Sequence, residues 1–249
     1  MAVTKLEDLS RSSLMQLIEL KYALLDSREE DALARLIETS VCVEGKKGRG
    51  KTLFAVAACY QMRERFNRHI ITVGSKMGLK PEFGAAESMT EIQFKDALAK
   101  IQEVVNESEE AAAEAVVGAL REKGVDLLYA TVVFDEAYKL FDARTPQDKL
   151  VRLFGYFMAQ QRHYFCTTIL LTPNREMVDR RVRQQVDWFG RCYHDDWNHT
   201  CTVRLTAGLD TIVFTFSGAD DSLHTPYYNM YNTHNLVGYR RSHLDIKSI

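Results

Sequence analysis

The chain lacks the features that mark secreted, membrane-spanning or highly flexible proteins. Only four prolines occur among 249 residues, so long disordered linkers are not expected. No apolar run reaches the roughly 18 residues that a bilayer span needs. The charged residues Lys5, Glu7, Asp8 and Arg11 near the start of the chain do not resemble a signal peptide. We therefore expect a cytoplasmic protein with no membrane span.

The chain also has no strong excess of positive or negative charge, since its formal net charge is only −2. The overall field does not favour binding to nucleic acid, so any contact with DNA must come from a local patch. The cysteine count is odd, and several cysteines lie in apolar segments. This pattern indicates a reduced intracellular protein and not a disulfide scaffold.

Short apolar segments alternate with helical patterns along the chain. Strands are expected at 40–43, 69–73, 127–134, 167–171, 188–193, 202–205 and 211–216. Helices are expected at 52–66, 90–123 (one or two exposed helices), 147–160 and, as a basic helix, after Arg175. Such alternation predicts a mainly parallel sheet with helices on both faces.

One segment has the spacing G-x4-G-K-T, between an expected strand and an expected helix. Glycines let backbone N–H groups converge on phosphate oxygens, and the following helix adds its positive end. Lys51 would reach the β and γ phosphates, and Thr52 would bind Mg²⁺. The strand-to-helix context disfavours a chance match in a basic loop. The sequence therefore predicts that ATP and Mg²⁺ bind to Gly45, Lys46, Lys47, Gly48, Arg49, Gly50, Lys51 and Thr52.

Two adjacent acids follow the expected strand at 127–134. Asp135 would hold Mg²⁺ through water, and Glu136 would act as general base for the attacking water. The alternative is a strand that simply runs into an acidic turn, which the upstream phosphate motif disfavours. A glutamate at this place is typical of motor ATPases and unusual in switch GTPases.

A polar residue after the fourth strand is a candidate sensor of the γ-phosphate. Asn174 fits this role best and Thr172 less well, although Pro173-Asn174 is also ordinary turn chemistry.

Arginines are frequent in the second half of the chain. One of them, supplied by a neighbouring subunit, would stabilise charge on the γ-phosphate; the candidates are Arg191, Arg144 and Arg162. Other arginines would contact DNA phosphates, or form an ordinary solvated surface. Lys76 and Lys80 are further candidates for DNA contact.

Two short spacings, Cys192-x-His194 and His199-x-Cys201, would suit zinc if their strands pair. Strand alternation alone also places such residues on one face, and this second interpretation is favoured.

These motifs predict an α/β fold, a P-loop NTPase of the RecA-like type with an antiparallel C-terminal edge. We expect one domain, 1–249, with a helical N-terminal extension (1–37), a nucleotide-binding core (38–218) and a C-terminal tail (219–249).

The motifs together resemble the FtsK/HerA superfamily. The resemblance rests on the segments 43–52, 133–137 and 141–144, and on the weaker segments 161–163, 168–172 and 231–233. Viral members include genome-packaging ATPases and the zonula-occludens-toxin-like assembly proteins of filamentous phages. The chain departs from the family pattern at Asn174, where glutamine is usual, and at Asn232, where aspartate is usual. The filamentous-phage branch carries a membrane span, which this chain lacks, so the packaging branch is favoured.

The resemblance implies an ATP-hydrolysing translocase that packages double-stranded viral DNA into a preformed capsid. It implies a ring, of six subunits, with ATP between subunits and an arginine donated in trans. Capsid or portal-vertex proteins would be partners, and the location would be the host cytoplasm, in association with the virion. Two alternatives are an assembly or export ATPase that acts at a membrane with a partner chain, and a non-motor module such as a switch or a small-molecule kinase.

Overall fold

The computed structural model describes residues 32–74, 79–80, 83, 86–106, 108–145, 148–195, 200–216 and 230. The chain divides into two units, 1–35 and 36–249, and only residues 32–35 of the first unit are described. The expected helices before residue 32 therefore lie outside the described residues, as does the expected tail apart from Met230.

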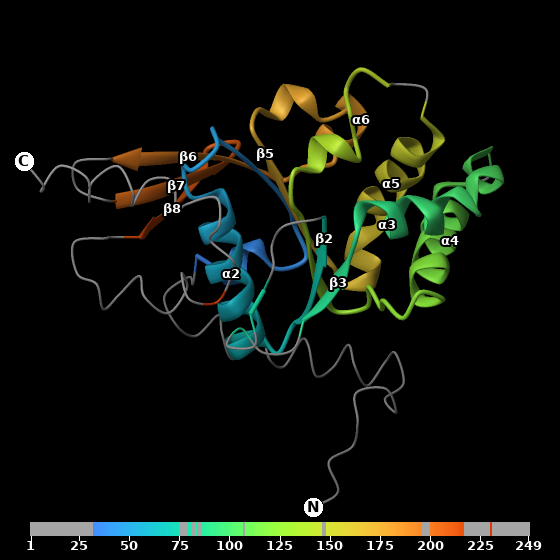
Figure 1. Cartoon of the computed structure of the whole chain (residues 1–249), viewed down its shortest axis with the longest axis horizontal. Helices are drawn as coiled ribbons and strands as arrows, with labels where there is room; N and C mark the ends of the chain where they lie inside the picture. The colour runs from blue at the N-terminus through green and yellow to red at the C-terminus, as the bar shows by residue number, and fades with distance from the viewer. Residues whose placement is uncertain are drawn as a thin grey trace, which may run out of the picture. The chain divides into compact units, whose positions relative to one another are not determined.

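Within the described residues, the second unit is built on one eight-stranded sheet (Figure 1). Its order is β3-β2-β4-β5-β1-β6-β7-β8. The strands from β3 to β6 are parallel, and β7 and β8 complete an antiparallel edge. The strands are β1 (Ser40–Glu44), β2 (His69–Val73), β3 (Glu87–Met89), β4 (Ala130–Phe134), β5 (Thr167–Thr172), β6 (Trp188–Asp195), β7 (Thr200–Ala207) and β8 (Asp210–Phe216).

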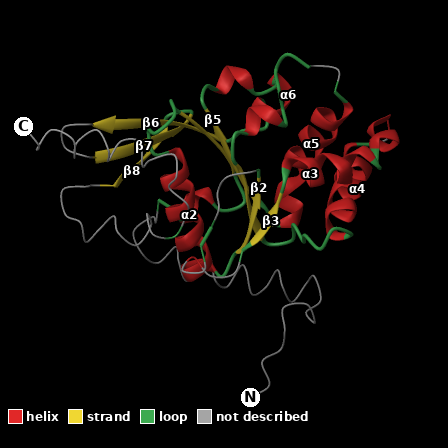
Figure 2. Cartoon of the chain, viewed as in Figure 1, coloured by secondary structure: helices red, strands yellow, loops and turns green. Residues whose placement is uncertain are grey.

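Helices cover both faces of this sheet. Helix α2 lies on one face, and α3, α4, α5 and α6 lie on the other (Figure 2). The α-helices are α2 (Lys51–Phe66), α3 (Glu91–Ala99), α4 (Glu109–Arg121), α5 (Lys149–Gln160) and α6 (Arg180–Arg183). The 3₁₀ helices are η2 (Ala34–Leu36), η4 (Gln102–Asn106), η5 (Ala137–Lys139), η6 (Gln161–Tyr164) and η7 (Arg175–Met177). The arrangement confirms the expected P-loop NTPase fold with an antiparallel C-terminal edge.

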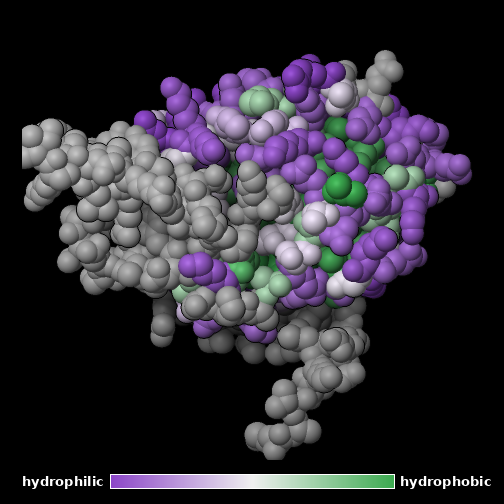
Figure 3. All heavy atoms as spheres, viewed as in Figure 1, coloured by the Kyte–Doolittle hydropathy of each residue, from purple (hydrophilic) through white to green (hydrophobic). Residues whose placement is uncertain are grey.

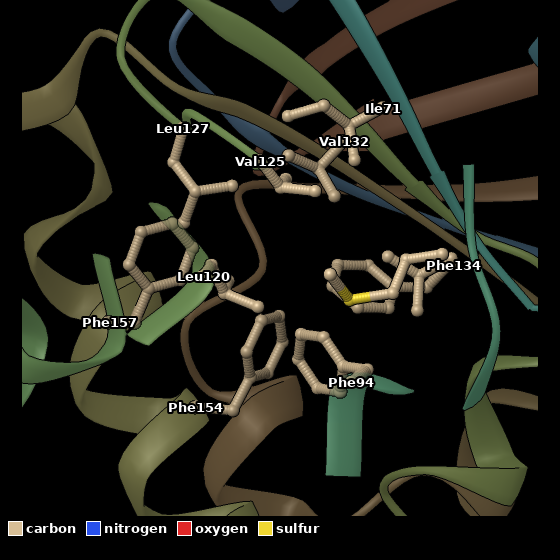
Figure 4. Close-up of a pocket in the computed structure, with 11 residues that line it drawn as sticks. Ile71, Phe94, Leu120, Val125, Leu127, Val132, Phe134, Phe154 and Phe157 are labelled. Carbon is tan, nitrogen blue, oxygen red and sulfur yellow. The ribbon is translucent and has the colours of Figure 1, made fainter. Parts of the chain in front are cut away.

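The core explains why the central strands are almost continuously apolar. Every residue of β1, β4 and β5 is buried, as expected for parallel strands covered on both faces. Phe141 and Phe154 stack at 4.2 Å between ring centroids, and Phe94 and Phe134 meet them edge-on. Figure 4 shows the cavity at this cluster, whose volume is about 10 Å³. A space of this size is about that of one water molecule, so the cluster is packed core and not a ligand site.

Three details differ from the sequence-based expectations. Strand β3 was not expected, because three residues of mixed polarity carry no periodic signal. Helix α4 is not simply exposed, since both of its valines and three of its alanines (Ala112, Ala113 and Ala119) are buried. The basic segment after Arg175 is two short pieces, η7 and α6, because an extended residue, Val178, separates them.

Arg68 is a buried cation at the amino ends of the central strands. Its side chain is among the largest fully buried ones, with 1% of the residue exposed. It donates to the carbonyls of Ala130 (2.7 Å) and Phe165 and to Thr167 Oγ1 (3.1 Å), and its guanidinium lies 4.5 Å from the ring centre of Tyr129. Arg68 therefore ties the starts of β4 and β5 together.

The described surface drawn in Figure 3 is mainly hydrophilic. On the face drawn in Figure 3, hydrophobic side chains form small separate patches among hydrophilic ones. Among the described helices, none has both the length and the apolar character needed to cross a membrane.

Candidate nucleotide-binding site

The phosphate-binding motif forms the predicted turn between β1 and α2. The N–H of Gly45 donates to the Thr172 carbonyl at 3.2 Å, which holds the start of the turn on β5. Gly48 and Gly50 have φ values of 78° and 95°, a region that residues with a Cβ rarely adopt. Helix α2 begins at Lys51, so its N-terminal N–H groups face the turn, as phosphate binding requires.

This turn rests on the β6–β7 hairpin, a contact that the motif alone does not reveal. A Cβ placed on Gly50 would lie 2.1 Å from Cys201 Sγ, and one on Gly45 would lie 3.1 Å from Cys192 Cβ. Cys201 Sγ also contacts the Arg49 carbonyl at 3.4 Å. Packing against the hairpin therefore favours glycine at both positions, and at Gly50 the positive φ favours it as well.

The side chain of Lys51 folds back on the turn. Its Nζ donates to the carbonyls of Gly45 at 2.6 Å and Lys46 at 3.1 Å. Burial lowers its pKa, although the nearby charges of Asp135 and Glu136 act in the opposite direction. Among the described residues this half-buried ammonium has only carbonyl groups as hydrogen-bond partners, so it would gain from a phosphate group.

The two acids follow β4, at the same edge of the sheet. The N–H of Asp135 donates to the Val73 carbonyl at 3.0 Å. Burial raises the pKa of Asp135, and the neighbouring Glu136 adds to this effect, whereas Lys51 opposes it. Glu136 has φ of 53°, precedes η5, and forms an ion pair with Lys139.

The residues expected to hold Mg²⁺ fit that ion in their chemistry. Mg²⁺ prefers hard oxygen ligands. Within the described part of the chain, the Thr52 hydroxyl has no hydrogen-bond partner, and the Asp135 carboxylate has no salt-bridge partner. The Asp135 carboxylate accepts a hydrogen bond from the Glu136 backbone but keeps further lone pairs, so it and the Thr52 hydroxyl could still bind the metal or its waters.

Asn174 follows β5, which lies between β1 and β4. Its Oδ1 accepts from the Glu176 N–H at 2.9 Å, which leaves its amide NH₂ without a partner among the described residues. Thr172 is fully buried, and its hydroxyl donates to the Asn174 carbonyl at 2.9 Å. Of the two sensor candidates, only Asn174 has a group accessible to a ligand.

A hollow of about 480 Å³ lies beside the P-loop. It is lined by Glu44, Gly45, Lys46, Arg49, Pro173, Asn174, Arg191, Cys192, Tyr193 and His194. The hollow joins the end of β5, the P-loop and β6, so it has room for the parts of a nucleotide beyond its phosphates.

Glu44 is a site residue that sequence reasoning did not single out. It ends β1 directly before the P-loop and accepts from Arg191 Nε at 2.8 Å and from the Arg175 N–H at 3.1 Å. Burial opposes its ionisation, but these hydrogen bonds outweigh burial and lower its pKa. The only sequence signal was an acid at the end of an apolar strand.

The three arginine candidates lie in three different places. Arg191 is opposite Glu44 in the β1–β6 register and lines the hollow of its own subunit. Arg144 follows η5, is 82% exposed, and pairs with Asp142 at 2.6 Å. Arg162 pairs with Asp187 at 3.1 Å, before β5 and β6 begin, and thus at the amino edge away from the P-loop.

The cysteines of the zinc hypothesis lie beneath the P-loop. His194 pairs with Cys201 in the β6–β7 register, while His199 lies outside the described residues. Burial raises the pKa of the Cys201 thiol to about 11 and that of Cys192 further. No cluster of three or more metal-binding side chains occurs among the residues that the structure describes.

The motif order and the fold agree with one known family. A family model for zonular occludens toxin (Zot) matches residues 40–197. The chain belongs to the Zot family. This membership confirms the expected resemblance to P-loop ATPases of the FtsK/HerA type. Within that superfamily the match is to the zonula-occludens-toxin-like members, whereas the sequence analysis favours the genome-packaging members. No curated protein matches the sequence.

Several solved structures are similar to this Zot-family chain. The N-terminal domain of zonular occludens toxin from Neisseria meningitidis is 15% identical, with 79% of this chain and 100% of that chain covered and a TM-score of 0.49. The DNA-packaging ATPase B204 of Sulfolobus turreted icosahedral virus is 13% identical, with 72% and 97% covered and a TM-score of 0.49. The conjugation coupling protein TcpA of pCW3 is 18% identical, with 78% and 64% covered and a TM-score of 0.46.

Proposed function

We propose that this protein is an ATP-hydrolysing motor that translocates double-stranded DNA and packages a viral genome into a preformed capsid. The hydrolytic part of the proposal is carried by one observation: β1, β4 and β5 end at the same edge of the sheet, beside Lys51, Asp135 and Asn174 respectively. Translocation and packaging are what the resemblance to the packaging ATPases implies. A triphosphate gripped at the P-loop would therefore meet the acids and the amide without any rearrangement of the sheet.

Each residue has a defined task in hydrolysis. The P-loop N–H groups and Lys51 hold the β and γ phosphates, and Thr52 and Asp135 hold Mg²⁺, which neutralises phosphate charge when bound. Glu136 takes a proton from water as the water oxygen bonds to the γ-phosphorus and the bond to the ADP oxygen breaks. The free NH₂ of Asn174 orients the γ-phosphate or the water.

Assembly into a ring, of six copies, would complete the site with an arginine from the neighbouring subunit. Arg144 is the best candidate, because it is 82% exposed and does not line the hollow of its own subunit, although it pairs with Asp142. Arg191 lines the hollow of its own subunit, and Arg162 lies at the opposite edge. Capsid or portal-vertex proteins would anchor this ring in the host cytoplasm and on the virion.

The first experiment measures ATP hydrolysis with and without double-stranded DNA. We expect Lys51→Ala and Glu136→Gln to lower the rate by about 100-fold or more. The control Lys123→Ala, at an exposed position after α4, should behave as wild type. If the wild-type protein neither hydrolyses ATP nor responds to DNA in any assembly, the proposal is wrong.

The second experiment tests the arginine in trans by mixing variants. Lys51→Ala subunits keep Arg144, whereas Arg144→Ala subunits keep an intact P-loop. Each should be inactive alone, and a mixture should regain part of the activity. Arg162→Ala should be active alone; an inactive Arg162→Ala variant, or no recovery on mixing, would contradict this assignment.

The Zot family match favours a second candidate, an ATPase that serves virion assembly or export at a membrane with a partner chain. Fractionation of infected cells separates the two: recovery with procapsids supports packaging, and recovery with membranes supports export. Full activity of a monomer would instead indicate a non-motor module.

A further inference from the structure

The face of the β6–β7 hairpin that points away from the P-loop has an unusual set of side chains. Alternation puts Cys192 and Cys201 against the P-loop and leaves Arg191, Tyr193 and Arg204 on the opposite face. Arg191 and Tyr193 stand at the rim between the two faces and line the nucleotide hollow as well, whereas Arg204 lines only the hollow of the opposite face. A hollow of about 260 Å³ lies there, lined in part by Arg175, Phe189, Arg191, Tyr193, Arg204 and Thr206. We call these six residues the arginine face.

Two of its arginines lie directly opposite each other. Arg191 of β6 pairs with Arg204 of β7 in the antiparallel register. Like charges in such positions destabilise a sheet. Glu44 compensates Arg191, but Arg204 has no ion-pair partner among the described residues. The arrangement would gain stability if an anion bound between them.

The nearby acids are already occupied. Glu44 is engaged by Arg191, with the Arg175 N–H as a further donor. Glu176 is shared by Arg183 at 2.6 Å and Arg175 at 3.7 Å. The arginine face therefore keeps excess positive charge.

Aromatic and hydroxyl groups complete the surface. The Arg175 guanidinium lies 5.5 Å from the ring centre of Phe189, within cation–π range. Tyr193 is 51% exposed, and on β8, next to Arg204, Val213 is 54% exposed. Figure 1 shows that β6, β7 and β8 extend beyond the helices α3, α4 and α5. Exposed side chains on β6, β7 and β8 spread the face over three neighbouring strands, which suits a polymer better than a single small anion.

We propose that the arginine face binds the phosphate backbone of a nucleic acid strand. Guanidinium groups recognise phosphates in a forked geometry, and threonine and tyrosine hydroxyls are common additional donors to phosphate and sugar. The inference rests on the proposed function only in its choice of DNA as the polymer, because it requires neither ATP nor hydrolysis.

The test measures binding of labelled DNA, double-stranded and single-stranded, by fluorescence anisotropy over a range of salt concentrations. Arg204→Ala should weaken binding about 10-fold and reduce the slope of log affinity against log salt by about 1. Arg204→Glu should weaken it further, and Arg204→Lys should retain most of the affinity. The two DNA arms show which form of the backbone the face prefers.

Arg121→Ala is the matched control, since Arg121 is also exposed but lies on α4 and pairs with Asp126. It should bind DNA as wild type does. ATP hydrolysis without DNA should be unchanged in all Arg204 variants, which shows that they are folded. If wild type binds DNA and the Arg204 variants bind it equally well, the assignment of this face is wrong while the motor proposal stands. If wild type binds no DNA of either form, the motor proposal itself fails.

One further outcome would overturn the assignment. If Arg204→Glu changes the mass of the assembly in sedimentation without DNA, the face is a contact between copies of the chain.

Discussion

Lys139 and Glu136 form an ion pair across the single turn of η5. The hydrogen bond with Glu136 raises the pKa of Lys139, whose Nζ also lies 3.8 Å from Glu91 Oε1 on α3. The carboxylate proposed as general base is thus held by a cation that has a second acidic partner close by. The ammonium occupies a carboxylate oxygen that would otherwise be free to accept a proton from water, so hydrolysis would be favoured when Lys139 moves towards Glu91.

Replacing Lys139 tests this relationship. We expect Lys139→Ala to raise the rate of ATP hydrolysis without DNA by about 2- to 5-fold, because a partly exposed ion pair is worth only about 1 kcal/mol or less. Steady-state phosphate release measures it, with Lys123→Ala as control. A fall in rate comparable with that of Glu136→Gln would show instead that Lys139 positions the glutamate for catalysis.

The two left-handed glycines of the P-loop should differ in their tolerance of a side chain. Both Gly48→Ala and Gly50→Ala meet the backbone strain of positive φ, about 1–2 kcal/mol. Only Gly50→Ala also collides with Cys201, since nothing lies within 4 Å of a Cβ on Gly48. Urea unfolding should show the larger loss for Gly50→Ala.

The double variant Gly50→Ala/Cys201→Ala separates collision from strain. It should recover part of the lost stability, because Sγ is removed while the backbone strain remains. Equal midpoints for Gly48→Ala and Gly50→Ala would contradict the packing described for the hairpin.

Asp135 should lower the stability of the nucleotide-free protein at neutral pH. Burial raises its pKa above the ordinary 3.8, so the folded state holds its proton more tightly than the unfolded state. The contribution of Asp135 to the free energy of unfolding is fully present below pH 3.8, and it is lost as the pH rises through the raised pKa of the folded state. Asp135→Asn should therefore raise the urea midpoint at pH 7 and abolish Mg²⁺-dependent hydrolysis.

The same variant should show no gain at a pH below the ordinary value for aspartate, where the wild-type carboxyl is already protonated. A lower urea midpoint for Asp135→Asn at pH 7 would mean that the attraction to Lys51 outweighs burial.

Removal of Arg68 should destabilise the fold without acting on the site directly. Arg68→Ala leaves the carbonyls of Ala130 and Phe165 buried without their donor, at a cost of about 2–4 kcal/mol. Denaturant unfolding, with Arg121→Ala as control, measures the loss. A change below about 0.5 kcal/mol would show that water or relaxation replaces the missing donor.

Local patterns predicted the parts of the site that are contiguous in sequence. The turn at Gly45–Thr52 and the acids after β4 each combine an apolar strand with the residues that follow it, and the structure places both at one edge of the sheet. Helix and strand positions could be predicted from the periodicity of apolar residues, because that signal also lies in contiguous residues. Short β3 had too few residues to give such a signal.

Contacts that depend on distant pairing could not be read from the chain. Glu44 meets Arg191 only because β6 adds in parallel to β1, and Gly50 meets Cys201 only because β7 then folds back on β6. Nothing in the sequence around these residues predicts how β6 pairs with β1 or how β7 pairs with β6. The same register places Arg191 at the hollow of its own subunit, a position that the sequence alone could not show.

The β6–β7 hairpin carries the phosphate turn on one side and the arginine face on the other. Both sets of side chains leave the same two backbones, in alternation, with no loop or hinge between them. If a nucleic acid strand binds the arginine face, tension on it would act on the same two strands that support the phosphate turn.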